Sequence, residues 1–474
     1  MKNVFLKKLK IAGLLGLAGA GVVAAIAGTQ ALAADPVNHA PAKAGAGDAL
    51  VGAPAGKDAG APPDTVAAAA PRNAQEAAIE RGRYVAVAGD CIACHTAHGS
   101  KQPFAGGLAL ETPFGKLVAS NITQDVKTGI GSWTEEQFVR AVRLGKGKHG
   151  ENLYPAMPYN AYVKVSDADM RDLWAYMKTI KPVENKVEAN QLPFPFNIRL
   201  LMAGWNWLFF DAAPFKPDAT RSVEWNRGAY LVQGLAHCAS CHTAKNFFGA
   251  DKSETLAGGT LGGWYAPNIT GSTGGLHDWS VEQTVEYLQT GGNRISMASG
   301  PMAEAVENST QHMSSADLRA IAVYLKSVAG PALPARPAPL PADNPQMLLG
   351  ARVYEVNCAA CHGSDGKGLD GLVTSLGGNS ALQAEVAGNL VNAVLRGTTP
   401  AITHGKPTGA GMPGFAWKLS DAEVAAVGTF VRNHWGNAAP AVPAGSVSEA
   451  RKNLNAPAKL KTGSDTVLNS KPFF

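Results

Sequence analysis

Three copies of the pattern Cys-x-x-Cys-His are the residues of this sequence whose types and spacing could do redox chemistry. Together they use all six cysteines. In such a pattern the two thiols form thioethers with the vinyl groups of haem, and the adjacent histidine ligates the iron. The sequence therefore predicts three covalent haems. The attachment residues are Cys91, Cys94, Cys238, Cys241, Cys358 and Cys361, and the iron ligands are His95, His242 and His362.

Two other uses of paired cysteines fit these motifs poorly. A structural zinc site needs four ligands, and no cysteine outside the three motifs is left to complete one. A dithiol redox motif needs no histidine after its second cysteine, and it is not expected three times in one chain. Spacing and count therefore both favour haem attachment.

A methionine beside a proline follows each motif at a similar distance. These residues are Met157, 62 residues after His95, Met302, 60 residues after His242, and Met412, 50 residues after His362. Because proline disfavours helix interiors, we expect these methionines in irregular loops that fold over the distal side of each haem. Met297 lies in the same stretch as Met302 and is an alternative to it.

Histidine–methionine ligation would fill both axial positions of each iron, so the irons would carry electrons and bind no substrate. The sequence has no dinucleotide-binding fingerprint, and the glycines at 366 and 368 lie too close behind the third motif to form a phosphate loop. We therefore predict that the chain is not an enzyme by itself. Further candidates for a distal ligand are His98, His149, His277, His312 and His404.

The first 33 residues have the three parts of a secretory signal peptide. Lysines precede an apolar run from Ile11 to Ala27, and Ala31-Leu-Ala33 supplies the small residues of a cleavage site. An uncleaved membrane anchor is the alternative interpretation. Because covalent haem attachment takes place outside the cytoplasm in bacteria, the predicted export agrees with the predicted haem motifs.

Composition limits what else the chain could be. Its 474 residues leave room for about three domains, and a hydrophobic content of 46% permits proper cores. Four lysines before residue 11 account for most of the formal net charge of +5. The sequence has no cluster of Lys or Arg that would indicate a nucleic-acid partner. Residues 34–73 hold few large apolar side chains, so we expect a flexible leader there.

An internal repeat relates the first two haem motifs. The string Arg-Gly-x-Tyr precedes both, at residues 81–84 and 227–230. The string Asn-Ile-Thr follows both, at 121–123 and 268–270, and a tryptophan stands eleven or twelve residues after each asparagine. These coincidences predict a duplicated helical domain.

Each predicted domain ends with a helix. The first begins with a helix at about 74–89, and serine caps at Ser166, Ser315 and Ser420 open the terminal helices. Capping boxes that start at Thr134 and Ser280 predict a further helix in each of the first two domains. The predicted order is a first domain at 74–190, an aromatic linker at 191–219, a second domain at 220–330, a Pro-rich linker at 331–344, a shorter third domain at 345–436 and a C-terminal tail at 437–474.

The first linker holds many aromatic residues between Leu192 and Phe210. They are Phe194, Phe196, Trp205, Trp207, Phe209 and Phe210. Prolines and polar residues interrupt the segment too often for a membrane span. Two interpretations stay open: an inter-domain core, or a surface for a partner, a quinone or the membrane interface.

The combination of motifs resembles a known family of redox proteins. Beside the three haem motifs it includes Asn-Ile-Thr followed by a Trp-led helix, Tyr-Pro-Ala-Met-Pro-Tyr at 154–159 and Asn-Arg-Gly-Ala-Tyr-Leu-Val at 226–232. Over about residues 74 to 435 the chain resembles the triheme cytochrome c subunit of bacterial membrane-bound dehydrogenases. That family serves quinoprotein alcohol dehydrogenase, flavin-dependent gluconate and sorbitol dehydrogenases, and some aldehyde dehydrogenases. The third domain looks like a generic class I cytochrome.

The resemblance implies a mainly α fold of three tandem class I cytochrome c domains, with three covalent haem c groups. It also implies that a catalytic subunit of the PQQ or FAD type oxidises the substrate, and that this chain delivers the electrons to ubiquinone at the periplasmic surface of the inner membrane. An alcohol dehydrogenase is the first choice of partner. A gluconate, sorbitol or aldehyde dehydrogenase, or a role as a soluble multihaem shuttle to an oxidase, is the alternative. A peroxidase-like enzyme would need a five-coordinate iron, which a methionine for every haem opposes.

Overall fold

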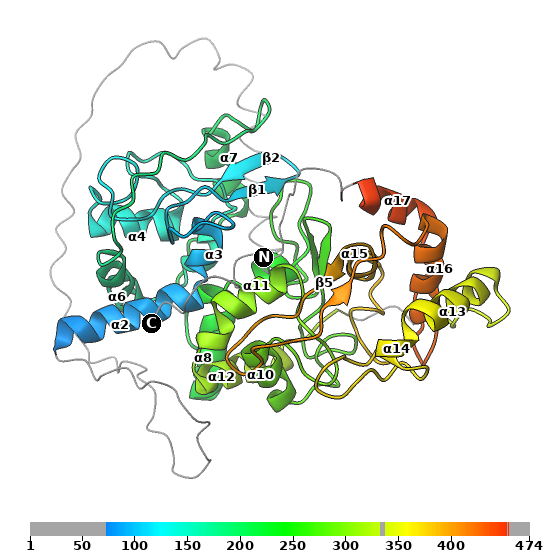
Figure 1. Ribbon diagram of the computed structural model, residues 1–474. Helices are drawn as coiled ribbons and strands as arrows, with labels where there is room; N and C mark the ends of the chain where they lie inside the picture. Colours follow the sequence, from blue (N-terminus) through cyan, green and yellow to red (C-terminus); the bar gives the residue numbers. More distant parts are fainter. Residues whose placement is uncertain (1–72, 332–336, 453, 455–474) are drawn as a thin grey trace, which may run out of the picture. The chain divides into compact units, whose positions relative to one another are not determined.

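The computed structural model describes residues 73–331, 337–452 and 454. The predicted signal peptide and all of the predicted leader except Asn73 lie outside the described residues, as do part of the Pro-rich linker and the end of the tail. The described chain is mainly helical, with three short two-stranded sheets (Figure 1). The mainly α fold is therefore as predicted.

The first domain is a set of helices around a β-hairpin. Its elements are α2 (Ala74–Ala88), α3 (Cys91–His95), β1 (Ala109–Thr112), β2 (Gly115–Val118), α4 (Glu135–Leu144), α5 (Tyr159–Tyr162) and α6 (Asp167–Met177). Strands β1 and β2 are antiparallel, with Ala109 opposite Val118. The predicted capping box at the start of α4 is present, because Thr134 and Gln137 exchange side-chain to backbone hydrogen bonds.

The second domain repeats this order. Its elements are α8 (Val223–Tyr230), the π-helical turn η2 (Leu231–Leu235), α9 (Ala239–His242), β3 (Gly259–Leu261), β4 (Trp264–Ala266), α10 (Val281–Thr290), α11 (Pro301–Asn308), η3 (Thr310–His312) and α12 (Ser315–Ser327). The capping box of Ser280 and Gln283 opens α10 as predicted, and the cap of α12 is Ser314, one residue before the expected Ser315. Asn121 and Asn268 accept hydrogen bonds from the Thr two residues on in the same way, so the repeated string builds the same turn twice.

The third domain places its sheet later in the sequence. Its elements are α13 (Pro345–Asn357), α14 (Ala359–His362), α15 (Gly388–Arg396), β5 (Gly397–Thr398), β6 (Met412–Pro413), α16 (Asp421–Val431) and α17 (Ala444–Lys452), drawn from yellow to red in Figure 1. Helix α17 falls in the stretch predicted to be a tail from residue 437. Val442 and Val447 are fully buried in the core of this domain, and Arg451 bonds the carboxylate of Asp421 at 2.6 Å. The third domain therefore continues to Lys452.

In each domain the first helix crosses a later helix at a glycine. A Cβ on Gly82 of α2 would lie 1.9 Å from a carbonyl oxygen of α6, and one on Gly228 of α8 would lie 1.9 Å from a carbonyl oxygen of α12. In the third domain a Cβ on Gly350 of α13 would lie 2.2 Å from a carbonyl oxygen of α16. All three domains therefore share one packing device, in which only glycine lets the two backbones approach so closely.

The first two domains share one hydrophobic core and exchange tyrosines. The hydroxyl of Tyr84 donates to the carboxylate of Asp317 at 2.7 Å and accepts from the backbone N–H of Ser314, the cap of α12. In the reverse direction, Tyr230 donates to Asp169 and accepts from the backbone N–H of Ser166, the cap of α6. Each domain thus places its tyrosine on the terminal helix of the other, as in a two-fold dimer.

The predicted aromatic linker begins as part of the first domain. Gln191 forms a β-bridge with Lys116 of β2, and the side chain of Asn190 accepts from the backbone N–H of Val118. Helix α7 (Leu201–Phe209) follows. Within the described ranges, no helix is long and apolar enough to cross a membrane.

Candidate functional site: the three haem-binding motifs

Helix α3 presents the first motif. Asp90 lies between α2 and α3 and has a left-handed backbone, with φ of 50°. The single helical turn that follows it holds Cys91, Cys94 and His95. Nδ1 of His95 lies 2.7 Å from the carbonyl oxygen of Ser120. This bond fixes the tautomer with the proton on Nδ1 and leaves Nε2 for iron. Burial lowers the pKa of His95, which favours the neutral imidazole that a metal requires.

The second and third motifs differ in how their histidines are held. Nδ1 of His242 lies 2.7 Å from the carbonyl oxygen of Pro267, which repeats the arrangement of the first domain. Nδ1 of His362 is buried, and no hydrogen-bond partner for it occurs among the described residues. The two duplicated domains therefore orient their imidazoles by the same backbone contact, and the third does not.

The six thiols form no disulfide, and the first cysteine of each motif, Cys91, Cys238 and Cys358, packs against an apolar core. Burial raises the pKa of Cys91 and of Cys238 to about 12. Free, paired thiols one helical turn apart, each next to an oriented histidine, are the groups that covalent haem attachment needs. The residues of the first two motifs therefore fit haem c, and those of the third supply the same donor set.

The loops that carry the predicted distal methionines begin with the same backbone hydrogen bond in the first two domains. The N–H of Leu153 donates to the carbonyl of Gly145, and the N–H of Ala298 donates to the carbonyl of Gly291, both at 2.7 Å. The two glycines are the left-handed C-caps of α4 and α10. Leu153 and Ala298 therefore hold equivalent positions in the repeat.

Met157 and Met302 each stand four residues beyond these equivalent positions, so Met302 is the structural counterpart of Met157. Met297 instead forms a β-bridge with Gly292 and lines a small cavity against the third domain. The expectation of an irregular loop is wrong for Met302, which lies in the first turn of α11. Pro301 starts that helix because the first helical position needs no N–H donor.

The third predicted methionine, Met412, lies in β6. Its backbone pairs with Thr398 of β5, and its side chain packs partly buried against the core of the third domain. Met157 lies in a bend between β-bridge and helix, as expected for an irregular loop. Each of the three methionines therefore comes before the helix α6, α12 or α16 that follows it in its own domain.

The first and second motifs adjoin across the two domains, a contact that the sequence does not reveal. The hydroxyl of Tyr162 in α5 donates to the carbonyl of Gly89 at 2.7 Å, and Nε2 of His237 lies 3.3 Å from the same oxygen. Gly89 and His237 come shortly before Cys91 and Cys238. The side that carries the attachment cysteines is therefore where the two sites meet.

Two buried carboxyl groups lie beside this junction. Burial, with a contribution from Glu304, raises the pKa of Asp90 well above its usual value, and Oδ1 of Asp90 has no partner within the described chain. Burial, followed by the nearby Glu307, raises the pKa of Glu304 to about 7. Burial therefore disfavours the charged form of both carboxyl groups at this junction.

The second domain also contacts the third. The side chain of Asn389 in α15 bonds both backbone groups of Tyr265 in β4, at 2.7 and 2.8 Å. Nζ of Lys406 donates to the carbonyl of Gly292 at 2.7 Å, and Met302 packs in a small cluster with Ala401. The second site therefore has direct contacts to both neighbours.

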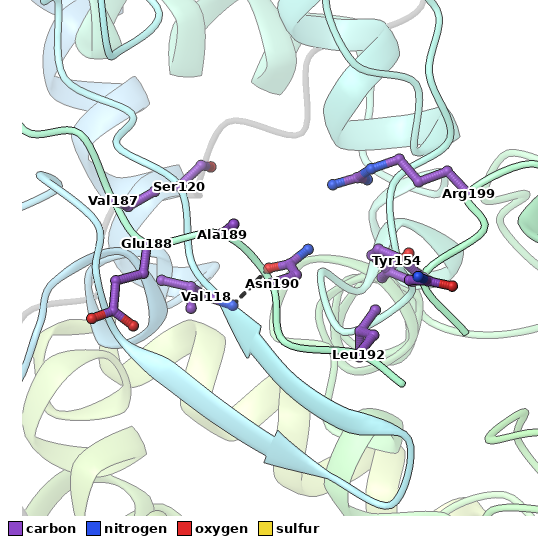
Figure 2. Close-up of a pocket in the computed structure, with 10 residues that line it drawn as sticks. Val118, Ser120, Tyr154, Val187, Glu188, Ala189, Asn190, Leu192 and Arg199 are labelled. Atoms are coloured by element: carbon purple, nitrogen blue, oxygen red, sulfur yellow. Dashed lines mark hydrogen bonds between the residues drawn. The ribbon is translucent and has the colours of Figure 1, made fainter. Parts of the chain in front are cut away.

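A cavity of about 390 Å³ lies between the first domain and the aromatic linker (Figure 2). Ser120, whose carbonyl holds His95, lines it together with Tyr154 and Arg199. The guanidinium of Arg199 lies 4.9 Å from the ring centre of Tyr154 and donates to the carbonyl of Asn152 at 2.9 Å. The cavity therefore reaches from the linker to the backbone that positions the first haem ligand.

The helical fold with repeated Cys-x-x-Cys-His motifs defines a c-type cytochrome. A cytochrome c family model matches residues 79–181 and 348–435. The chain is 39% identical to the fructose dehydrogenase cytochrome subunit of Gluconobacter japonicus, over 80% of this chain and 84% of that protein. It is 40% identical to the gluconate 2-dehydrogenase cytochrome c subunit of Pantoea cypripedii, over 82% of this chain and 92% of that protein.

A third relative is one of the subunits of nicotinate dehydrogenase from Pseudomonas putida. It is 43% identical over 77% of this chain, but the chain spans only 31% of its length. The chain belongs to the family of cytochrome c subunits of dehydrogenase complexes. It is accordingly an electron-transfer subunit with covalently bound haem, and not the catalytic subunit, as the sequence predicts.

Proposed function

We propose that this chain takes electrons from a catalytic dehydrogenase subunit, relays them through three covalent haems and delivers them to ubiquinone at the periplasmic surface of the inner membrane. The observation that carries the proposal is the contact of the second domain with both others, through the Gly89 carbonyl on one side and through Asn389 and Lys406 on the other. Three sites in one contiguous series suit a relay.

Haem bound at these motifs supplies reversible one-electron chemistry at its iron. The protein would hold each haem by two thioethers, orient His95 and His242 through their Nδ1 bonds, and offer Met157, Met302 and Met412 as second axial ligands. Because methionine would occupy the sixth position, these side chains would also exclude water and substrate from the iron. The chain itself would therefore move electrons without binding the dehydrogenase's substrate.

The catalytic partner is proposed to be a dehydrogenase of the PQQ or FAD type. The resemblance of the motifs places an alcohol dehydrogenase first, and the relatives named for fructose and gluconate dehydrogenases support a sugar or sugar-acid dehydrogenase as the second candidate. Both candidates place the same demand on this chain, namely an electron acceptor that docks on the catalytic subunit.

The aromatic linker is the proposed contact with the membrane interface and the quinone. Phe194, Leu200 and Trp207 are exposed, and Phe247 and Phe248 from the second domain add two exposed rings. The ring centres of Phe209 and Phe248 lie 5.8 Å apart, so the linker and the second domain meet at these two rings. Trp207 suits a membrane–water interface, because an indole ring combines large apolar area with a polar N–H, and the phenylalanines beside it add apolar area.

Part of the linker instead matches the inter-domain interpretation. Trp205 donates its indole N–H to the carbonyl of Phe248 at 2.9 Å, and Phe210 packs edge-on against Tyr159 of the first domain. These residues join the two domains, whereas Trp207 and Phe194 face outward. The cavity beside Arg199 lies at the same linker and offers space for a quinone ring close to the first haem motif.

The test isolates tagged chain from membranes of the producing bacterium and measures reduction of a soluble ubiquinone analogue. We expect a PQQ- or FAD-containing dehydrogenase to copurify and to drive that reduction with its own substrate. Replacing Phe194, Trp207, Phe247 and Phe248 with serine should release the chain from the membrane fraction and lower quinone reduction. Replacing the exposed Trp417 of the third domain in the same way is the control. Isolation without a dehydrogenase, or normal retention of the serine variant, would contradict the proposal.

A further inference from the structure

The carbonyl oxygen of Gly89 accepts from both of the first two domains. Gly89 caps α2 two residues before Cys91, and the buried hydroxyl of Tyr162 donates to its carbonyl from the same domain. His237, the residue before Cys238, approaches the same oxygen from the second domain. Side chains from two domains thus converge on one peptide group beside a haem motif.

The two side chains also contact each other. Their ring centres lie 5.5 Å apart, with an angle of 83° between the planes. Burial lowers the pKa of His237, so the ring is neutral and carries one proton. The Gly89 carbonyl requires that proton on Nε2, because an oxygen acceptor needs an N–H donor. Burial likewise raises the pKa of Tyr162, which keeps its hydroxyl a donor.

The attachment cysteines lie close to this contact. A Cβ on Gly89 would lie 3.7 Å from Sγ of Cys91 and 3.5 Å from the side chain of Leu235 in the second domain. Gly89 therefore packs both against the first attachment cysteine of its own domain and against the second domain.

We propose that Tyr162 and His237 are positioning residues that lock the first two haem motifs at a fixed separation through the Gly89 carbonyl. The lock sets the rate at which one electron passes between haems bound there. One iron loses the electron that the other gains, and no proton is transferred. This inference rests on the proposed function, specifically on haem at both motifs.

The experiment measures electron exchange between individually assigned haem methyl resonances by NMR, in the purified full chain. His237→Leu removes the donor, and we expect it to slow exchange between the first two haems several-fold, because the rate of electron transfer falls steeply as the distance between two redox centres grows. Tyr162→Phe should act in the same direction. His237→Gln keeps an N–H donor and should recover most of the rate. Tyr354→Phe, which removes a hydroxyl that donates to the Gly363 carbonyl in the third domain, is the matched control and should leave exchange between the first two haems unchanged.

Haem content separates the two proposals. A wild-type chain with fewer than three haems overturns the proposed relay, whereas three haems with an unchanged exchange rate in His237→Leu overturns the lock. If His237→Leu does not fold, Tyr162→Phe decides, since it removes one hydroxyl and no ring. Equal slowing in His237→Leu and His237→Gln would also contradict the lock, because it would show that the lost ring and not the lost hydrogen bond is responsible.

Discussion

Local spacing predicts the covalent sites because the two thiols and the histidine share a single helical turn. The carbonyls that orient His95 and His242 belong to residues 25 positions farther along the chain. These contacts form only when the chain folds, so no local sequence pattern predicts them. The same limit applies to His237, whose partner in the first domain lies 148 residues away. The only sign of this contact in the sequence is the histidine itself, which stands directly before the second motif.

The equivalent positions of Met157 and Met302 in the repeat lead to a prediction for Met302. If it is an axial ligand, Met302→Ala should remove about a third of the methionine-to-iron charge-transfer absorbance of the oxidised protein, because one of three such bonds is lost. Met297→Ala is the matched control and should leave the band intact. The opposite pattern would transfer the ligand role to Met297.

Helices α4 and α10 were predictable as elements, because their capping boxes and amphipathic patterns are local. Helix α17 was not, since an Ala- and Pro-rich stretch gives no strong periodicity, and its stability comes from packing Val447 and Arg451 on the third domain. The crossing glycine of that domain, Gly350, was also missed, because no Arg-Gly-x-Tyr string surrounds it. The physical requirement there is space between helices, not a motif.

Glycine at a helix crossing gives a stability prediction. Gly228→Ala should destabilise the protein by about 1–3 kcal/mol, since its Cβ would overlap a backbone carbonyl of α12 that cannot move aside. Gly204→Ala in α7 is the control. Nothing lies within 4 Å of its added Cβ, so it should be neutral or stabilise by about 0.5–1 kcal/mol. Denaturant unfolding measures both, and equal effects would refute the crossing argument.

Across the whole molecule, the reciprocal tyrosines explain why a duplicated sequence forms one core. Tyr84 and Tyr230 belong to the repeated Arg-Gly-x-Tyr string, and each reaches the terminal helix of the other domain. The sequence predicted the duplication, but a pairing across domains cannot be read from either copy alone. The same string thus serves twice, with its glycine at the helix crossing inside a domain and its tyrosine between domains.

The Tyr84 contact predicts a response to acid. Burial alone would raise the pKa of Asp317, but the hydrogen bonds and charge of Arg227, with the bond from Tyr84, hold it below its usual value of 3.8. A carboxyl whose pKa is lowered by folding contributes stability that is fully present above its unfolded pKa of about 4 and is lost as pH falls from there through the lower folded pKa. Asp317→Asn should therefore lower stability at pH 7 and flatten its acid dependence.

Urea unfolding between pH 7 and pH 3 measures this response. Asp278→Asn is the control, because Asp278 is exposed and bonds only its neighbour His277 among the described contacts. A variant Asp317→Asn that keeps the steep acid dependence of the wild type would show that other carboxyl groups govern it.

The central claim is that one chain carries three redox sites in series. Coulometric reduction of the purified, fully oxidised chain counts the electrons that each molecule accepts. The account predicts three electrons per chain, and two in a variant whose third motif is disabled by Cys358→Ala and Cys361→Ala. A wild-type chain that accepts two electrons or fewer would contradict it.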